Sequence, residues 1–236
     1  MESQDCICII PARGGSKRIK RKNLKEFCGK PILAYSIQNA KKSGIFSEII
    51  VSSDDEEILS IARELGANTL KRPENLSDDT ASTREVILHA IEQLSVQNAK
   101  PQNTKGLWVC CLYATAPLLD FNALKETYKL ARQKAQDCYC FSAVEYDYSP
   151  YRAFNIIEGT NKMLFLEHFT KRSQDLEKVY HDAGQFYFAR AEVWQNRQNI
   201  FEDSLSFLLP PSRVQDIDTL ADWELAELKF KLLKKV

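Results

Sequence analysis

The most informative stretch of the chain reads Cys6-Ile7-Cys8-Ile9-Ile10-Pro11-Ala12-Arg13-Gly14-Gly15-Ser16-Lys17. Its apolar start, a short run bounded by a turn, predicts a buried strand. The loop that follows holds seven cations between positions 13 and 25 and no acidic side chain, although the whole chain carries no net charge. Two adjacent glycines let the backbone approach a ligand and turn N–H groups toward it. The loop therefore suits a concentrated anion, above all a polyphosphate.

The two best-known phosphate-binding patterns do not describe this loop. It contains neither G-x-x-x-x-G-K-[ST] nor G-x-G-x-x-G. A solvated charge run or a localisation-type basic cluster would also be rich in Lys and Arg, but such clusters are typical of tails and exposed helices. This loop follows directly on a buried strand, and ligands in open α/β sheets bind at the carboxyl ends of strands. Its placement favours phosphate binding.

Outward from this loop, apolar strand-like runs alternate with amphipathic helical segments. Pro31 and Gly44 bound the first helix, and Asp54 and Asp55 are typical N-caps for the second. Alternation of this kind implies parallel strands with right-handed crossovers. We therefore expect an α/β fold, a mostly parallel sheet flanked by helices, in a single domain over residues 1–236. Strands are expected at 6–10, 48–52, 68–71, 107–112, 138–144 and 206–209, and helices at 31–43, 56–65, 82–94, 121–136 and 219–235.

Residues 145–188 break this alternation. Ten aromatic side chains fall in this range, and its helical periodicity is weak. We expect a small inserted β-rich lobe that covers the substrate or packs against a second subunit, since aromatic residues are enriched in interfaces. A plain aromatic minicore is the alternative that the pattern leaves open.

The composition is that of an ordinary globular protein. The 236 residues are 44% hydrophobic, with 32 basic and 32 acidic side chains, whereas nucleic-acid-binding domains are usually strongly basic. No apolar run is long enough to span a membrane, and the first residues do not resemble a signal peptide. Seven cysteines cannot all pair within the chain, and their spacing does not suit zinc. We expect reduced thiols, a cytoplasmic location, and neither nucleic acid nor membrane as a partner.

Two carboxylates lie close together near the end of the chain, in Gln215-Asp216-Ile217-Asp218-Thr219. On an extended segment, side chains at i and i+2 point the same way and can converge on one cation. Mg²⁺ takes one or two carboxylates and completes its shell with water and substrate phosphates. The alternative is helix capping, because Asp218 or Thr219 would be a good N-cap for the last helix.

Three further segments offer polar groups next to expected strands or helices. Arg72 is a candidate second phosphate contact, and Asp79–Ser82 is a candidate edge for a base or ribose, although a polar loop with an N-cap explains that segment equally well. Tyr113–Pro117 and Asp182–Tyr187 place polar groups and turn residues where a pocket could lie. His181, beside an aspartate, fits a structural role better than a catalytic one.

Taken in order, these segments resemble the cytidylyltransferases that activate nonulosonic acids, the sialic-acid-like sugars. The resemblance covers nearly the whole chain and is strongest over Ile10–Lys17 and at Lys22-Asn23. It implies a Rossmann-like nucleotidyltransferase fold, CTP and an acidic nine-carbon sugar as substrates, Mg²⁺ as cofactor, and a homodimer formed through the lobe at 145–188. Four further segments match in order and spacing: Ile49–Asp54, Arg72-Pro73, Asp79–Ser82 and Asp216–Asp218.

The resemblance also implies a reaction and roles for residues. The anomeric 2-hydroxyl of the sugar attacks the α-phosphorus of CTP in line, giving the CMP-sugar and pyrophosphate. Lys22, Asp216 and Asp218 are the expected catalytic residues, and the two aspartates hold Mg²⁺. The general base is left open between an ionised Asp216, an ionised Asp218 and a metal-bound hydroxide. The expected CTP contacts are Arg13, Gly14, Ser16, Lys17, Asn23, Arg72 and Ser82.

Two departures bear on which sugar is used. Sialic acid enzymes usually carry Gln-Pro-Thr-Ser-Pro where this chain has Tyr113–Pro117, and they also differ at Asp182–Tyr187. Both departures resemble the pseudaminic acid branch, so Tyr113 and Gln185 are candidate sugar contacts. Legionaminic acid, sialic acid or another acidic sugar remains an alternative, and a non-catalytic phosphate- or RNA-binding module is a more distant one.

Overall fold

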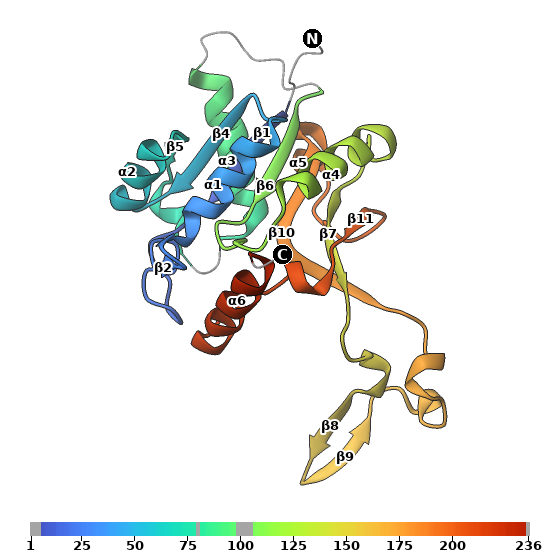
Figure 1. Ribbon diagram of the computed structural model, residues 1–236. Coiled ribbons are helices and arrows are strands. Elements are labelled where there is room, and N and C mark those ends of the chain that lie inside the picture. The colour runs from blue at the N-terminus through green and yellow to red at the C-terminus, as the bar shows by residue number, and fades with distance from the viewer. Residues whose placement is uncertain (1–5, 79–80, 98–105, 235–236) are drawn as a thin grey trace.

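The core of the molecule is a seven-stranded mixed sheet (Figure 1). The computed structural model describes residues 6–78, 81–97 and 106–234. The strand order is β11-β7-β10-β6-β1-β4-β5, and β10 alone of these seven runs antiparallel to its neighbours. The expected mostly parallel sheet is therefore confirmed. Its strands are β1 (Cys6–Pro11), β4 (Glu48–Ser53), β5 (Asn68–Lys71), β6 (Trp108–Leu112), β7 (Cys140–Glu145), β10 (Tyr180–Arg190) and β11 (Leu205–Leu208).

Helices cover both faces of this sheet. Along β1, Cys6, Cys8 and Ile10 belong to one apolar cluster with residues of α1, α2 and α4, whereas Ile7 and Ile9 belong to another with residues of α3 and α5. A strand that is buried on both faces has no polar alternation, which explains its uninterrupted apolar run. The helices are α1 (Ile32–Ser43), α2 (Glu56–Glu64), α3 (Thr83–Gln97), α4 (Phe121–Lys134), α5 (Ala191–Asn196) and α6 (Leu220–Leu233).

Helix ends follow the capping signals in the sequence. Asp55 caps α2 by accepting hydrogen bonds from the amides of Glu57 and Ile58. Gly44 ends α1 in the left-handed conformation, with φ +64°, where glycine has no steric penalty. Shorter 3₁₀ turns connect other elements, at Glu74–Leu76, Pro150–Arg152, Leu166–His168, Ser173–Asp175 and Pro211–Arg213.

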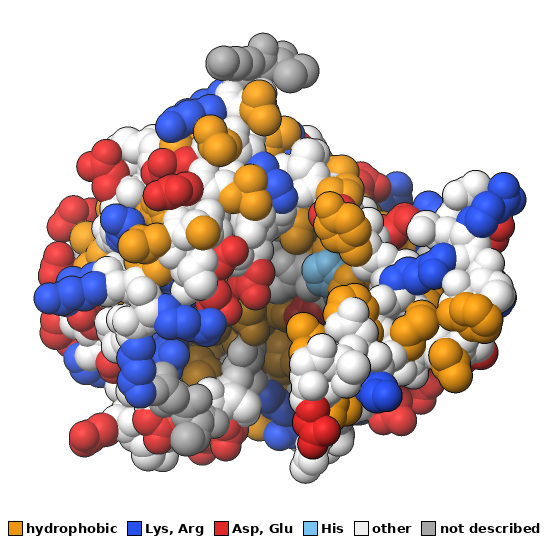
Figure 2. All heavy atoms as spheres, turned by 90° about the horizontal axis from the view of Figure 1, so that it is seen from below, with side chains coloured by type: hydrophobic (Ala, Val, Ile, Leu, Met, Phe, Trp, Pro, Cys, Tyr) orange, Lys and Arg blue, Asp and Glu red, His pale blue; other side chains and the backbone are white. Residues whose placement is uncertain are grey.

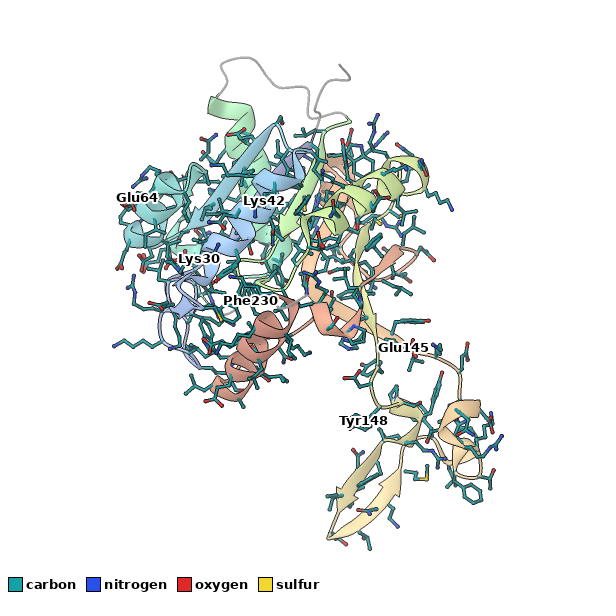
Figure 3. All side chains as sticks on the ribbon, viewed as in Figure 1. Lys30, Lys42, Glu64, Glu145, Tyr148 and Phe230 are labelled. Carbon is teal, nitrogen blue, oxygen red and sulfur yellow. The ribbon has the colours of Figure 1, made fainter. Side chains whose placement is uncertain are left out.

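A third apolar cluster lies outside the main sheet and joins the two ends of the chain. It contains Ile19 of the cation-rich loop, Ile32 of α1, and Ile217 and Trp223 at the start of α6. Phe230 of α6 (labelled in Figure 3) packs edge-on against Tyr35 of α1, with ring centroids 5.0 Å apart. A small hairpin of β2 (Glu26–Phe27) and β3 (Lys30–Pro31) leads into α1 beside it.

A small lobe projects from the sheet between β7 and β10 (Figure 1). It carries the hairpin of β8 (Phe154–Ile157) and β9 (Thr160–Met163), and Glu145 and Tyr148 mark where the chain leaves the sheet (Figure 3). The range of 145–188 expected for it extends too far, because residues 180–188 belong to β10. Phe186 and Phe188 belong to one buried cluster and Tyr187 to the other. Because this strand carries aromatic residues on both faces, its sequence resembled the aromatic lobe and was not recognised as a core strand.

All seven cysteines are free thiols, and five of them are buried. Burial raises the pKa of Cys6, Cys110 and Cys111 well above the usual value for a thiol. These side chains therefore act as small apolar groups in the sheet. Among the described residues, no helix is both long and apolar enough to cross a membrane.

Candidate active site

A cleft of about 460 Å³ opens at the carboxyl ends of β1 and β6. The cation-rich loop after β1 forms one side of it, and Tyr113–Thr115 after β6 form another. Arg72, the start of α3 and Asp218 complete its lining. Segments far apart in the sequence thus meet where ligands bind in open α/β sheets.

The cation-rich loop is folded against the protein and not extended into solvent. Ile19 is buried, and the amide of Lys22 donates to its carbonyl over 3.2 Å. Asn23 is 7% exposed and donates from Nδ2 to the carbonyl oxygen of Arg13 over 2.9 Å. Of the predicted CTP contacts in this loop, Arg13, Ser16, Lys17 and Asn23 line the cleft, as does Lys22. The anchored backbone holds several cations on one surface.

Gly14 differs from the expectation that it faces a ligand. Its amide donates to Asp54 Oδ1 over 2.9 Å. A Cβ at this position would lie 2.7 Å from Asp55 Oδ2, far inside van der Waals contact. The backbone at Gly14 therefore packs closely against the N-terminus of α2, and only glycine leaves room for this contact. The contact holds the start of the loop in place.

Arg72 supplies a second, buried source of positive charge. It is 5% exposed and donates to the carbonyl oxygen of Ser52 over 2.7 Å and to its Oγ over 3.3 Å. Burial lowers the pKa of Arg72, and nearby Asp54 opposes that shift. A cation that lies at the cleft surface but is held by backbone is well placed to bind an anion.

The C-terminal carboxylates are tied to the cation-rich loop. Lys22 Nζ donates to the carbonyl of Ile217 over 2.6 Å and lies 3.6 Å from Asp218 Oδ1, while Arg18 pairs with Asp218 Oδ2 at 2.8 Å. Ile217 is buried in the third apolar cluster. Because neighbours in an extended segment point to opposite sides, the side chains of Asp216 and Asp218 are left on the other side from that cluster.

Helix capping does not account for Asp218. Thr219 is the N-cap of α6 and forms a reciprocal capping box with Asp222. Asp222 Oδ2 also accepts from the backbone amide of Asp218. The carboxylate of Asp218 is thus not needed for the cap, and it lines the cleft instead.

The electrostatics of Asp216 favour a cation nearby. The side chain of Asp216 reaches solvent, but the surrounding protein partly desolvates it, which raises its pKa. Repulsion from Asp218 raises this pKa further, whereas the charge of Lys22 lowers it. Within the described part of the chain, no group of three or more His, Cys, Asp or Glu residues could hold a metal. Two carboxylates that repel each other nevertheless fit Mg²⁺, which takes its remaining ligands from water and phosphates.

Ser82 is a helix cap. Its amide and Oγ both donate to Glu85 Oε2 over 2.7 Å, and the Glu85 amide donates back to Ser82 Oγ over 3.2 Å. Its neighbours Ala81 and Thr83 line the cleft, whereas Ser82 does not. Asp79 and Thr80, of the same expected edge, lie outside the described residues.

The two predicted sugar contacts occupy different layers. Tyr113 lines the cleft, and its hydroxyl lies 3.0 Å from Thr83 Oγ1. Gln185 is 3% exposed and lies behind it, donating from Nε2 to the carbonyl of Arg213 over 2.6 Å. The ring of the exposed His181 contacts the carbonyl of Asp182 and the ring of Tyr146. Thr83 also lines the cleft but was not among the predicted contacts. Its position, directly after the N-cap predicted at the start of a helix, is the feature of the sequence that could have indicated it.

Comparisons with known proteins agree with this geometry. Residues 7–216 match the family model described as cytidylyltransferase. Pseudaminic acid cytidylyltransferase of Campylobacter jejuni is 49% identical over 229 residues, covering 96% of each chain. N-acylneuraminate cytidylyltransferase of Escherichia coli is 30% identical over 93% of this chain and 51% of its own length.

The fold has a solved counterpart at much lower sequence identity. The structure of CMP:2-keto-3-deoxy-manno-octonic acid synthetase complexed with CTP matches with a TM-score of 0.70 at 15% identity, covering 98% of this chain and 99% of that one. This likeness confirms the Rossmann-like nucleotidyltransferase fold. Because the family model matches residues 7–216, most of its length, the chain belongs to the cytidylyltransferase family.

Proposed function

We propose that this chain transfers CMP from CTP to the anomeric hydroxyl of a nonulosonic acid, pseudaminic acid in particular, and releases pyrophosphate. The observation that carries the proposal is the 49% sequence identity, over 96% of each chain, with an enzyme named for pseudaminic acid. The cleft supports it, because Arg72 and the cations of the loop after β1 line one cavity together with the carboxylate of Asp218. Asp216, two residues earlier in the chain, is not among the residues that line this cavity.

In the proposed reaction, positive charge reduces the electrostatic repulsion between the two substrates. Both substrates are anions, and the triphosphate must accept attack by a sugar that carries its own carboxylate. Arg13, Lys17, Lys22 and Arg72 neutralise that charge from fixed positions, which stabilises a transition state without reorganisation. The new bond joins the sugar's anomeric oxygen to the α-phosphorus, while the hydroxyl proton passes to the general base. The bond from that phosphorus to the bridging oxygen breaks, so pyrophosphate carries away the electron pair.

We assign Mg²⁺ to Asp216 and Asp218. When bound, the cation supplies positive charge to the triphosphate. Lys22 has a positioning role in this assignment, because its ammonium group joins the cation-rich loop to the backbone between the two aspartates. Asn23 acts through Arg13, whose carbonyl oxygen it holds.

We also propose a cytoplasmic homodimer formed through the projecting lobe. Five buried free thiols suit a reducing compartment. Large apolar side chains on the lobe are exposed, among them Ile156 at 71% and Leu166 at 67%, and Figure 2 shows hydrophobic side chains on the lobe surface. Apolar groups gathered in this way are typical of an interface between subunits.

The decisive experiment is a sugar panel with pyrophosphate release as the readout. The purified protein is incubated with CTP, Mg²⁺ and one acceptor at a time: pseudaminic, legionaminic, N-acetylneuraminic or 2-keto-3-deoxy-manno-octonic acid. We expect the highest kcat/KM with pseudaminic acid, and little turnover when ATP or UTP replaces CTP. A higher kcat/KM with another acidic sugar would reassign the substrate. RNA binding without turnover on any acceptor, weakened steeply by salt, would favour a binding module.

A further inference from the structure

A second cavity, of about 290 Å³, lies between α1, the segment after β6 and α6. None of the described residues that line it also lines the cleft of the candidate active site. Among the described residues of its lining, none is acidic and four are cations, namely Lys30, Lys42, Arg213 and Lys234. We call this cavity the basic pocket. Because the whole chain carries no net charge, positive charge gathered in this way indicates an anion as the ligand.

The helical period directs side chains of α1 and α6 into the basic pocket. Residues that recur at i, i+3, i+4 and i+7 lie on one face of a helix. On α1 this spacing holds for four residues of the lining: Tyr35, Gln38, Asn39 and Lys42. On α6 and its C-cap it holds for Phe230, Leu233 and Lys234. Figure 3 labels Lys42 of α1 and Phe230 of α6, together with Lys30, which precedes α1.

Aromatic rings hold two of the lysines in place. Lys30 Nζ lies 4.2 Å from the centroid of the Tyr35 ring. Lys234 Nζ lies 4.6 Å from the centroid of the Phe230 ring. The two rings pack edge-on against each other, so each ammonium group lies over a ring of one aromatic pair. Lys30 also donates to Gln38 Oε1. A ring attracts a cation through its quadrupole but carries no net charge, so these contacts position the ammonium groups without neutralising them.

The charges of the basic pocket are largely uncompensated by the protein. Within the described part of the chain, Arg213 is the one pocket cation that pairs with an acid, at 3.6 Å from Asp120 Oδ2. Burial lowers the pKa of Lys30, and repulsion from Lys234 and Lys42 lowers it further. Like charges that repel one another around a cavity are stabilised by an anion that contacts several of them at once.

The cations of the lining indicate phosphate chemistry. Lysine ammonium groups bind phosphate oxygens as point charges, without the fixed geometry that a bidentate contact requires. A carboxylate carries one negative charge and would balance a single lysine, whereas a phosphate group carries about 1.5 to 2 negative charges at neutral pH. Two linked phosphates therefore match the three lysines better than either, and they extend across more of the cavity.

The basic pocket borders elements that also form the active-site cleft. Asn39 Nδ2 donates to the carbonyl of Leu119 over 2.8 Å. One turn earlier on α1, Ser36 Oγ donates over 2.8 Å to the carbonyl of Tyr113, a residue that lines the cleft. At its other end, α6 begins two residues after Asp218. An anion between α1 and the end of α6 would therefore brace the helix that follows the carboxylate segment.

We propose that the basic pocket is a second ligand site, which binds linked phosphates, pyrophosphate above all, and holds the end of α6 against α1. The site is separate from the cleft, so the inference goes beyond the proposed function and does not depend on which sugar the cleft accepts. Nucleoside triphosphates carry the same chemical group, and the experiment separates the two sources.

Isothermal titration calorimetry with pyrophosphate, at low salt and without Mg²⁺, measures binding. Lys42→Gln combined with Lys234→Gln, the pocket variant, removes two charges at exposed side chains, where the fold has little to lose. We expect the Kd of a wild-type pyrophosphate site to rise at least about tenfold, the effect of a lost charge-assisted hydrogen bond. Lys129→Gln combined with Lys134→Gln, the α4 variant, removes two exposed lysines outside the pocket lining and should leave that Kd unchanged.

Two further ligands define the chemistry of the site. Inorganic phosphate should bind the pocket at least about tenfold more weakly than pyrophosphate, since it contacts fewer lysines. CTP separates the sources of the linked phosphates. A Kd for CTP that also rises in the pocket variant would mean that nucleotides enter the pocket, whereas an unchanged Kd for CTP would leave free pyrophosphate as the ligand.

Hydrogen exchange locates the bound anion. Pyrophosphate should slow amide exchange over residues 228–233 of α6 in wild type and in the α4 variant, and not in the pocket variant. Three results would overturn the proposal: an equal Kd for pyrophosphate in wild type and the pocket variant, equal losses in both double variants, or exchange in α6 that pyrophosphate does not slow. Inorganic phosphate that binds as tightly as pyrophosphate would contradict the assignment to linked phosphates.

Discussion

Lys22 shows how one side chain can connect two halves of a site. Its ammonium group contacts the backbone at Ile217 and lies near Asp218, although 195 positions separate residues 22 and 217. Desolvation raises the pKa of Asp216, and repulsion from Asp218 raises it further. At the scale of single residues, a bound divalent cation would relieve the repulsion between these two carboxylates.

Asp216→Asn should separate activity from stability. Because the pKa of Asp216 is raised in the folded protein, folding favours the protonated carboxyl. The ionised carboxylate therefore lowers the stability of the fold at a pH above that raised pKa, and this loss is absent below the ordinary value of 3.8. At pH 7 without Mg²⁺, we expect the variant to melt at the same temperature as wild type or higher. Its turnover should fall by at least about 100-fold, as when one charge-stabilising group is lost.

Thermal melts with and without Mg²⁺ and CTP, together with pyrophosphate release, measure both effects. Wild type should gain stability from the ligands by mass action, and the variant should gain much less. Asp203→Asn, an exposed site 3.9 Å from Arg197, is the control and should change neither quantity. Near-normal turnover in Asp216→Asn would contradict the metal assignment.

The loop between β1 and β2 is the element on which the cleft depends most. It begins where Gly14 packs on the first turn of α2 and ends where Asn23 holds the carbonyl of Arg13. Between these two points, Ile19 anchors the loop in the third apolar cluster. Its cations are therefore arranged by contacts on the side of the loop away from solvent.

Adjacent glycines provide a matched test of this element. Gly14→Ala places a methyl group 2.8 Å from Asp55 Cβ, so we expect a loss of about 1–3 kcal/mol in the free energy of unfolding and a higher KM for CTP. Gly15→Ala has no atom within 4 Å of the new methyl group and should change stability by no more than about 0.5 kcal/mol. Urea unfolding and steady-state kinetics measure these effects, and equal results for both variants would contradict the packing argument.

How far sequence predicts these elements depends on where their partners lie. The strand at 6–10 was identifiable because burial on both faces leaves a continuous apolar run. Arg13, Lys17, Lys22, Arg72 and Asp218 were identifiable by residue type and position, and all of them line the cleft. By contrast, Gly14 packs on Asp55 and Gln185 bonds to Arg213, and nothing local in the sequence indicates such distant partners. The pairing register of β10 also shifts between Asp182 and Tyr187, which interrupts the alternation of buried and exposed side chains that indicates a strand.

On the scale of the whole molecule, the sheet and the lobe differ in how far their apolar side chains are buried. Apolar clusters cover both faces of the sheet, whereas the lobe leaves Ile156, Ile157, Leu166 and Phe169 more than half exposed. Such side chains are costly in water unless another surface covers them. This contrast is the physical basis for the proposed dimer.

A charge placed on the lobe should separate the subunits. Ile156→Asp introduces a carboxylate at a side chain that is 71% exposed in one protomer, where the fold of that protomer has little to lose. We expect the mass measured by light scattering after size-exclusion chromatography to fall from dimer to monomer. Leu232→Asp, at a 64% exposed position on α6 and outside the lobe, should keep the dimer mass. A monomeric wild type, or dissociation by Leu232→Asp alone, would place the interface elsewhere or remove it.

The contact between Lys22 and Ile217 has a consequence for how the protein is made. Synthesis proceeds from the N-terminus, so the cation-rich loop leaves the ribosome long before the segment that carries the carboxylates. Until residues 216–218 are free to dock, the nascent chain holds an anion-attracting loop without the partner that completes the cleft. On the proposed assignment, catalysis therefore begins only after residues 216–218 have been translated and have docked, and chains that stop before this segment transfer no CMP.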